Sequence, residues 1–353
     1  MNSHQASQAD WGRLFEAAIR IKQMAPWEWV DEADVFGVQD PETGEIGFVS
    51  VMGALGEHTA VSVYLGATAL AKFMYLQEVP PELLLEYPEM LLEIPQLQAS
   101  FEDRGVLDDW DRQLIRNLGL KFRGRNAWPR FQSFRPGFMP WRLAPDEIRF
   151  LTLALEQLEQ VAPRVRADRS LLPNDEAGGF FVRSPCTQQE GAEGWEDRYI
   201  QIPPPEFPPV SLYWDPTDVK RLKRAAGRGE IIELDFFQFP GCFGNKAERP
   251  VSAYVLFAVH AQSNMILCAE FIQIKDTLEN MWGQIPGVLL SRLVQAEMRP
   301  KEIRVQSNLL FNVLPPAFQE LGTKVVLKPS LKKLRAAKRE MLAALEFGRP
   351  PFS

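Results

Sequence analysis

The spacing of apolar and polar residues divides the first half of the chain into short segments of helical or strand period. Asp40-Pro-Glu-Thr-Gly44 predicts a hairpin turn, because Asp and Pro start turns and a glycine accepts the positive φ that ends one. The expected elements are helix 10–24, N-capped by Asp10, strands 34–38, 45–51 and 59–64, helix 67–76, strand 97–101, helices 108–118 and 144–161, and a hairpin of 179–183 with 197–202.

The second half has a more regular order. The pattern predicts helix 218–227, strands 230–239, 253–259 and 265–272, helix 278–297, strand 300–305, helix 308–322, strand 323–327 and helix 330–345. Gly283 and Pro286 indicate a kink in the fifth of these elements, and Gly322 a helix end. Three meandering strands followed by alternating helices and strands is the order of the ribonuclease H-like fold, whose last two strands enter in parallel.

These patterns predict an α+β protein, in which an N-terminal mixed α+β domain precedes a ribonuclease H-like α/β domain. The run Pro203-Pro-Pro-Glu-Phe-Pro-Pro209 favours an extended conformation and cannot lie inside a helix or a central strand. We therefore expect domains at 1–202 and 217–353, joined by residues 203–216.

Charge supports a division of this kind. The chain has a formal net charge of −7. From Pro216 onward there are 20 Lys and Arg against 13 Asp and Glu, a net charge of +7, whereas residues 1–215 carry −14. Opposite signs indicate two functional units, or two units that attract each other.

Composition narrows the class of protein. Apolar residues make up 46% of the chain, which is typical of a folded domain, and the three widely spaced cysteines form no CxxC pair. His4, His58 and His260 have no companion at metal-ligand spacing, and no nucleotide-binding or nucleophile-elbow motif occurs. Because these motifs are missing, we expect a protein that binds no metal or cofactor. No apolar run reaches the roughly 18 residues of a membrane span, so we also expect a cytoplasmic protein that binds no membrane.

The element order of the second half raises the question of nuclease chemistry. Such sites gather carboxylates so that two divalent metals can hold a phosphate during displacement. Asp235 occupies the middle of the first strand and Glu279 the start of the following helix, but the end of the fourth strand reads Val305-Gln306-Ser307 and has no acid. Asp235 and Glu279 are therefore candidate catalytic residues, and the alternative interpretation is that Asp235 is an exposed or edge-strand carboxylate.

Basic residues concentrate near the C-terminus. On the predicted final helix, Lys332, Arg335 and Arg339 share one face, with leucines on another. Cations of this kind neutralise phosphates, and a solvated helix face has the same pattern. A second basic patch lies at 220–224.

Residues 120–141, the aromatic–basic segment, interleave five basic and six aromatic residues and show neither a helical nor a strand period. Two interpretations stand: a stacking platform for bases, or a long loop anchored by aromatic rings with arginines stacked on them. The candidate binding residues of the segment are Arg123, Arg125, Trp128, Arg130, Arg135 and Trp141.

Several strings resemble a bacterial family of uncharacterised two-domain proteins. The first half carries the string FGVQDPETGEIGFVSVMG from Phe36 to Gly53. The other strings are Val63–Gly66, Leu120–Gly124, Trp128–Phe131, Arg135–Gly137, Arg299–Val305 and Glu320–Gly322. The resemblance implies two domains and no established activity, so it transfers no catalytic residue.

Taken together, the sequence predicts a non-catalytic binding or scaffolding protein. Its basic C-terminal domain is expected to contact nucleic acid or an acidic protein partner. The alternatives are a divergent metal-dependent nuclease that uses Asp235 and Glu279, and an acidic first domain that docks on the basic second one.

Overall fold

The computed structural model describes residues 6–54, 56, 58–80, 83–84, 87, 89–172, 179–187, 193–225, 227–244 and 248–346. The chain forms two compact units, each with its own sheet and helices, so the expected α+β class is confirmed. The first unit comprises Met1–Pro136 and Pro140–Phe207, and the second comprises Gly137–Met139 and Pro208–Ser353. Within the described ranges, no helix is both long and apolar enough to cross a bilayer.

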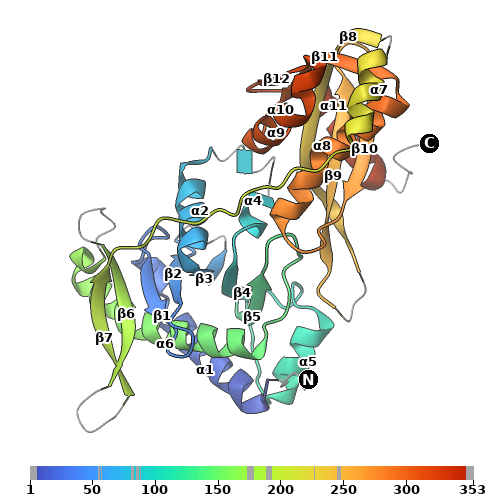
Figure 1. Ribbon diagram of the computed structural model, residues 1–353. Helices are drawn as coiled ribbons and strands as arrows, with labels where there is room; N and C mark the ends of the chain where they lie inside the picture. Colours follow the sequence, from blue (N-terminus) through green and yellow to red (C-terminus); the bar gives the residue numbers. More distant parts are fainter. Residues whose placement is uncertain are drawn as a thin grey trace. The chain divides into compact units, whose positions relative to one another are not determined.

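The first unit is built on a seven-stranded sheet of order β5-β4-β3-β2-β1-β6-β7, in which only β1 and β6 pair in parallel (Figure 1). Its elements are α1 (Gln8–Met24), β1 (Phe36–Gln39), β2 (Ile46–Met52), β3 (Thr59–Leu65), α2 (Gly66–Glu78), α4 (Glu89–Leu92), β4 (Gln96–Glu102), α5 (Asp109–Asn117), β5 (Trp128–Phe134), α6 (Pro145–Ala167), β6 (Phe180–Thr187) and β7 (Glu193–Ile200).

Strand alternation places two apolar layers on this sheet. Val49, Val61 and Leu97 face the main core with α1 and α6, whereas Phe48 and Tyr64 face a smaller core under α2. The hairpin and the first helix follow the sequence closely. The N-cap of α1 is Ser7, however, and Asp10 is its capping-box partner three residues later, because the Ser7 side chain accepts from the Asp10 amide at 3.1 Å.

The aromatic–basic segment contains regular structure that we did not expect. β5 is an edge strand with alternating burial, in which Pro129, Phe131 and Ser133 are buried. An edge strand tolerates a proline, since its outward amide has no ladder partner. The strand period was hidden by this proline and by large aromatic residues at half-buried positions.

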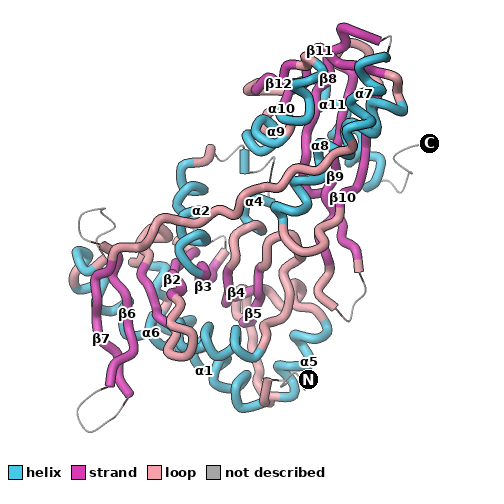
Figure 2. Tube along the Cα trace, viewed as in Figure 1, coloured by secondary structure: helices cyan, strands magenta, loops and turns pink. Residues whose placement is uncertain are grey.

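The second unit is a five-stranded sheet of order β10-β9-β8-β11-β12 (Figures 1 and 2). Strands β8, β9 and β10 form an antiparallel meander, while β11 and β12 run parallel to β8. The elements are α7 (Pro216–Arg224), β8 (Gly227–Phe243), β9 (Val251–His260), β10 (Ile266–Ile272), α8 (Leu278–Gln295), β11 (Met298–Val305), α9 (Asn308–Val313), α10 (Pro315–Phe318), β12 (Lys324–Leu327) and α11 (Lys332–Glu346).

Helices cover both faces of this sheet. One face, with Ile232 and Leu234, packs against α7, α8, α9 and α10. The other face, which alternation gives to residues 233, 235 and 237, packs against α11. The helix expected at 308–322 is instead broken into α9, α10 and a 3₁₀ turn, because Pro315 and Pro316 remove two backbone donors. Gly322 ends this region as expected, with φ of 65°.

Two glycines of α8 have a packing role. A Cβ at Gly283 would lie 2.0 Å from the Ser211 carbonyl oxygen, and one at Gly287 would lie 2.7 Å from that of Tyr213. The Tyr213 amide donates to the Gly283 carbonyl at 2.9 Å. The chain that enters the second unit therefore lies directly on α8, and glycine is required there for close approach.

A short piece of the aromatic–basic segment belongs to the second unit. Phe138 bridges to Val251, the Ser252 amide donates to the Gly137 carbonyl at 3.0 Å, and the Met139 amide donates to the Pro250 carbonyl at 2.9 Å. Phe138 also packs against the core of that unit. These three residues add a partial strand to the beginning of β9.

The stability of the first unit is expected to depend on Asp40 at the hairpin turn. Arg149 of α6 donates to both Asp40 oxygens at 2.8 Å, and these hydrogen bonds lower the pKa of the Asp40 carboxyl. The contribution is thus present above the ordinary pKa of about 4 and is lost as the pH falls through the lower folded value. Asp40→Asn should cost about 1.5–3 kcal/mol at pH 7 and less at pH 3, measured by urea unfolding.

Glu156→Gln is the matched control, because Glu156 forms an exposed ion pair with Arg13 at 3.5 Å. This change should cost less than about 1 kcal/mol at either pH. Equal losses for the two variants, or a loss for Asp40→Asn that does not depend on pH, would contradict the assignment.

Candidate functional site

The candidate acid Asp235 lies at the centre of the second unit. It sits on β8, the middle strand of the sheet, and is 1% exposed. Lys338 of α11 places its Nζ 3.1 Å from Asp235 Oδ2, and this lysine is itself only 9% exposed. The interpretation of Asp235 as an exposed or edge-strand residue is therefore wrong, because Asp235 is a buried partner in an ion pair.

A second carboxylate lies on the same face of β8. Glu233 is 6% exposed, and its Oε2 accepts a hydrogen bond from the Leu334 amide at 2.9 Å. Leu334 is in the first turn of α11, where backbone amides have no partner within the helix and favour negative charge. Both acids of β8 thus bind α11: Glu233 holds its first turn, and Asp235 holds a lysine in its middle.

The Lys338 ammonium is further enclosed by an aromatic ring. Its Nζ lies 3.6 Å from the centroid of Phe237, the next residue of β8 on this face. A cation so placed is stabilised by the ring quadrupole as well as by the carboxylate. The ammonium group thus lies between the Asp235 carboxylate and the Phe237 ring.

The other expected members of a nuclease site are not found around Asp235. Glu279 lies in the first turn of α8, which packs against the opposite face of the sheet, and Gln306 follows the end of β11. Among the described residues, no group of three or more His, Cys, Asp or Glu side chains could hold a metal ion. The described contacts of Glu233 and Asp235 on this face bind α11.

The outer side of α11 is strongly basic. Lys332 and Arg339 are exposed, and Arg335 is half-buried. Five side chains, the open cations, have no carboxylate within 4.0 Å among the residues that the structure describes: Lys324, Lys328, Lys332, Lys333 and Arg339.

The other basic patch is partly neutralised. On α7, Lys223 pairs with Glu320 at 2.7 Å and Arg221 pairs with Asp218 at 3.8 Å. A charged surface that retains free cations can bind anions with less competition from its own acids. The structure therefore separates two patches that looked alike in the sequence.

Three phenylalanines gather on the α11 face of the sheet. Phe239 of β8 lies on the same face as Asp235 and Phe237, because side chains alternate along a strand. Phe271 of β10 lies on this face too, since Phe271 and Phe237 both pair with Val255 of β9. The ring of Phe271, 46% exposed, lies 5.2 Å from that of Phe239 and 5.8 Å from that of Phe243. We call these residues the phenylalanine trio; strand register, which the sequence alone does not give, brings them together.

The aromatic residues of the aromatic–basic segment are mainly anchors. Phe122 stacks on Phe15 at 6.2 Å and contacts Trp128 edge-on at 5.8 Å. Trp141 pairs with Ser133 through two backbone hydrogen bonds of 2.7 and 3.0 Å. The ring contacts hold Phe122 and Trp128 against the first unit, and the backbone hydrogen bonds hold Trp141 beside β5.

The arginines of the segment fall into two groups. Arg130 lies 3.5 Å from Asp111, and Arg135 lies 3.0 Å from Glu147. Arg123 and Arg125 are exposed. The six predicted binding residues of this segment are thus spread over different environments, and their role in binding stays a prediction.

Histidine chemistry shows what spacing alone misses. His260 Nε2 lies 2.5 Å from Glu230 Oε2, and its Nδ1 lies 2.8 Å from Ser263 Oγ. His260 therefore has a carboxylate companion that does not lie at metal-ligand spacing in the sequence. Because Ile232 is the direct cross-strand partner of His260, Glu230 is its diagonal neighbour, and only the strand register reveals it.

The Asp235–Lys338 pair is expected to hold α11 on the sheet. Lys338→Met would leave a buried carboxylate without its cation and should cost about 3–5 kcal/mol of unfolding free energy. The double variant Asp235→Asn/Lys338→Met should recover much of this loss, which a double-mutant cycle in urea would measure.

Lys332→Met serves as the control, since it removes an exposed lysine from the same helix and should change stability by less than about 0.5 kcal/mol. Additive losses for the two buried substitutions would show that the pair does not act as a unit.

Comparison with known proteins agrees with the division into two units. Residues 11–183 match a family described as Domain of unknown function (DUF7309), and residues 218–342 match Domain of unknown function (DUF6930). No curated protein and no solved structure matches the chain. The chain is therefore similar, over most of its length, to two successive domain families whose function is not known.

Proposed function

We propose that the second unit is a ribonuclease H-like domain without metal-dependent chemistry, and that it binds single-stranded nucleic acid. One observation carries the proposal: α11 holds Lys338 on Asp235 with its inner side, and its outer side presents cations that have no carboxylate partner among the described residues. The Lys338 ammonium of this helix thus compensates the charge of Asp235, as a metal ion would in a nuclease, and the outer cations of the same helix can bind phosphates.

The strand order supports the fold assignment. A meander of three antiparallel strands, followed by two strands parallel to the first, gives the order third-second-first-fourth-fifth across the sheet. This is the arrangement expected for the ribonuclease H-like fold from the element order. Since a fold does not determine a function, the binding role rests on the surface residues.

Charge and aromatic surface together favour single strands. Phosphates are bound by mobile cations such as Lys332, Lys333 and Arg339. Exposed rings such as Phe271 add stacking surfaces that every base can use, whatever its sequence. An acidic protein would need the cations but not the rings, so we make it an outcome of the test.

The expected result is a salt-dependent affinity for labelled oligo(dT), measured by fluorescence anisotropy. Each phosphate contact to a single strand contributes about 0.7 to the slope of log affinity against log salt. Replacing Lys332, Lys333 and Arg339 by Ala should therefore lower the slope by about 2. Phe271→Ala should cost about 1–3 kcal/mol of binding free energy if a base stacks there.

The matched control replaces Lys220, Arg221 and Lys223 of α7 by Ala and should leave the slope nearly unchanged. Equal losses for the two triple variants would contradict the assignment to α11. Competition by polyglutamate as strong as that by oligo(dT) would indicate an acidic protein partner. Cleavage with Mg²⁺ or Mn²⁺ that Asp235→Asn abolishes would favour the nuclease alternative.

A further inference from the structure

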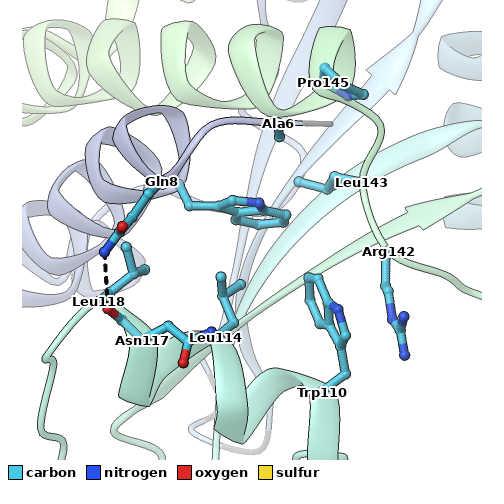
Figure 3. Close-up of a pocket in the computed structure, with 10 residues that line it drawn as sticks. Ala6, Gln8, Trp110, Leu114, Asn117, Leu118, Arg142, Leu143 and Pro145 are labelled. Carbon is cyan, nitrogen blue, oxygen red and sulfur yellow. Dashed lines mark hydrogen bonds between the residues drawn. The ribbon is translucent and has the colours of Figure 1, made fainter. Parts of the chain in front are cut away.

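The first unit contains a cavity that none of the preceding roles uses. It has a volume of about 570 Å³ and lies between the beginning of α1, helix α5 and the chain that leads into α6 (Figure 3). Small-molecule sites usually have volumes of roughly 300–1,000 Å³, apolar walls and a few polar groups. The cavity has these properties.

Two indole rings form part of its wall. Trp11 of α1 and Trp110 of α5 contact each other edge-on, with ring centroids 5.5 Å apart and planes at 69°. Trp11 is 7% exposed and also lies 6.3 Å from Phe131 of β5, so that its ring is held by the core. Two rigid aromatic surfaces at this angle favour a flat ring, which can contact one by its face and the other by its edge.

Arg142 is the cation of the cavity. Its guanidinium lies 4.5 Å from the ring centroid of Trp110 and 5.1 Å from that of Trp141. The Arg142 Nε has almost no exposed surface, and it has no hydrogen-bond partner within the described part of the chain. A guanidinium offers five N–H donors in a fixed plane and matches a carboxylate in two parallel hydrogen bonds.

The nearby acid Asp111 interacts electrostatically with Arg142, but its close contacts are with other residues. It accepts a hydrogen bond from the Asp108 amide at 3.2 Å and lies 3.5 Å from Arg130. Among the residues that the structure describes, no Asp or Glu lines the cavity, so a ligand carboxylate would be the anion in direct contact with Arg142.

Two other polar residues of the lining, Gln8 and Asn117, form hydrogen bonds within the first unit. Gln8 Nε2 donates to the Asn117 carbonyl at 2.9 Å, shown as the dashed line in Figure 3, and Asn117 Oδ1 accepts from Gln113 at 2.7 Å. These bonds join α1 to α5 at one end of the cavity. Among the described lining residues, Arg142 is the one with a buried side-chain polar atom that has no hydrogen-bond partner.

We infer that this cavity binds a small aromatic carboxylate, with its ring against Trp11 and Trp110 and its carboxylate on Arg142. One cation among apolar walls balances a single negative charge. A phosphate dianion would leave one charge uncompensated in surroundings where unpaired charge is costly. The site is independent of the function proposed for the second unit.

The test is calorimetric titration of the full chain with 2-naphthoate and, separately, with 2-naphthamide, its uncharged counterpart. The acid should bind more tightly than the amide. Arg142→Gln should weaken binding of the acid about ten- to a hundredfold and leave that of the amide within about twofold, since a hydrogen bond to a charged group is lost. Arg104→Gln is the matched control, because Arg104 stacks on Trp128 at 5.9 Å and does not line the cavity.

A second variant keeps the test decisive if Arg142→Gln does not fold. Leu114→Trp replaces a leucine of the cavity wall by a bulkier indole ring, which should fill the cavity and abolish binding of both compounds. Equal affinity for acid and amide, equal effects of Arg142→Gln and Arg104→Gln, binding that survives Leu114→Trp, or no binding of 2-naphthoate at millimolar concentration would each overturn the inference.

Discussion

The second unit depends on how two buried carboxylates of its central strand are compensated. A carboxylate taken out of water is tolerated only when a cation or strong donors replace its hydration. Glu233 accepts a hydrogen bond from a backbone amide in the first turn of α11, and Asp235 forms an ion pair with Lys338 of the same helix. The final helix is therefore bound by charge as well as by apolar packing, and its position fixes where its outer cations point.

This arrangement links architecture to chemistry. A metal-dependent nuclease keeps its acids unpaired so that they can attract divalent ions. In this protein the Lys338 ammonium lies 3.1 Å from Asp235, and we expect this pair to stabilise the fold. The effect of substituting Asp235 can therefore be interpreted only together with the effect of substituting Lys338.

The order of elements could be predicted from the sequence because strand and helix periods are local properties. Most of what the sequence did not reveal was non-local. The inward position of Lys338 was not recognised, although Leu331, Leu334, Lys338 and Met341 follow one helical stripe, and all four are buried. That spacing was a usable sign that the lysine points inward. The partners of His260 and the phenylalanine trio needed strand register, and the continuity of helix 308–322 was overestimated because two adjacent prolines outweigh an apolar period.

The three residues Gly137–Met139 give the protein an unusual connectivity. The chain leaves the first unit, adds a partial strand to the second, returns to build α6, β6 and β7, and only then continues into the rest of the second unit. The two units are consequently not consecutive modules along the gene. A break in the proline-rich stretch would leave Phe138 on the other polypeptide, so neither unit can be inherited or transplanted whole by a single cut in the coding sequence.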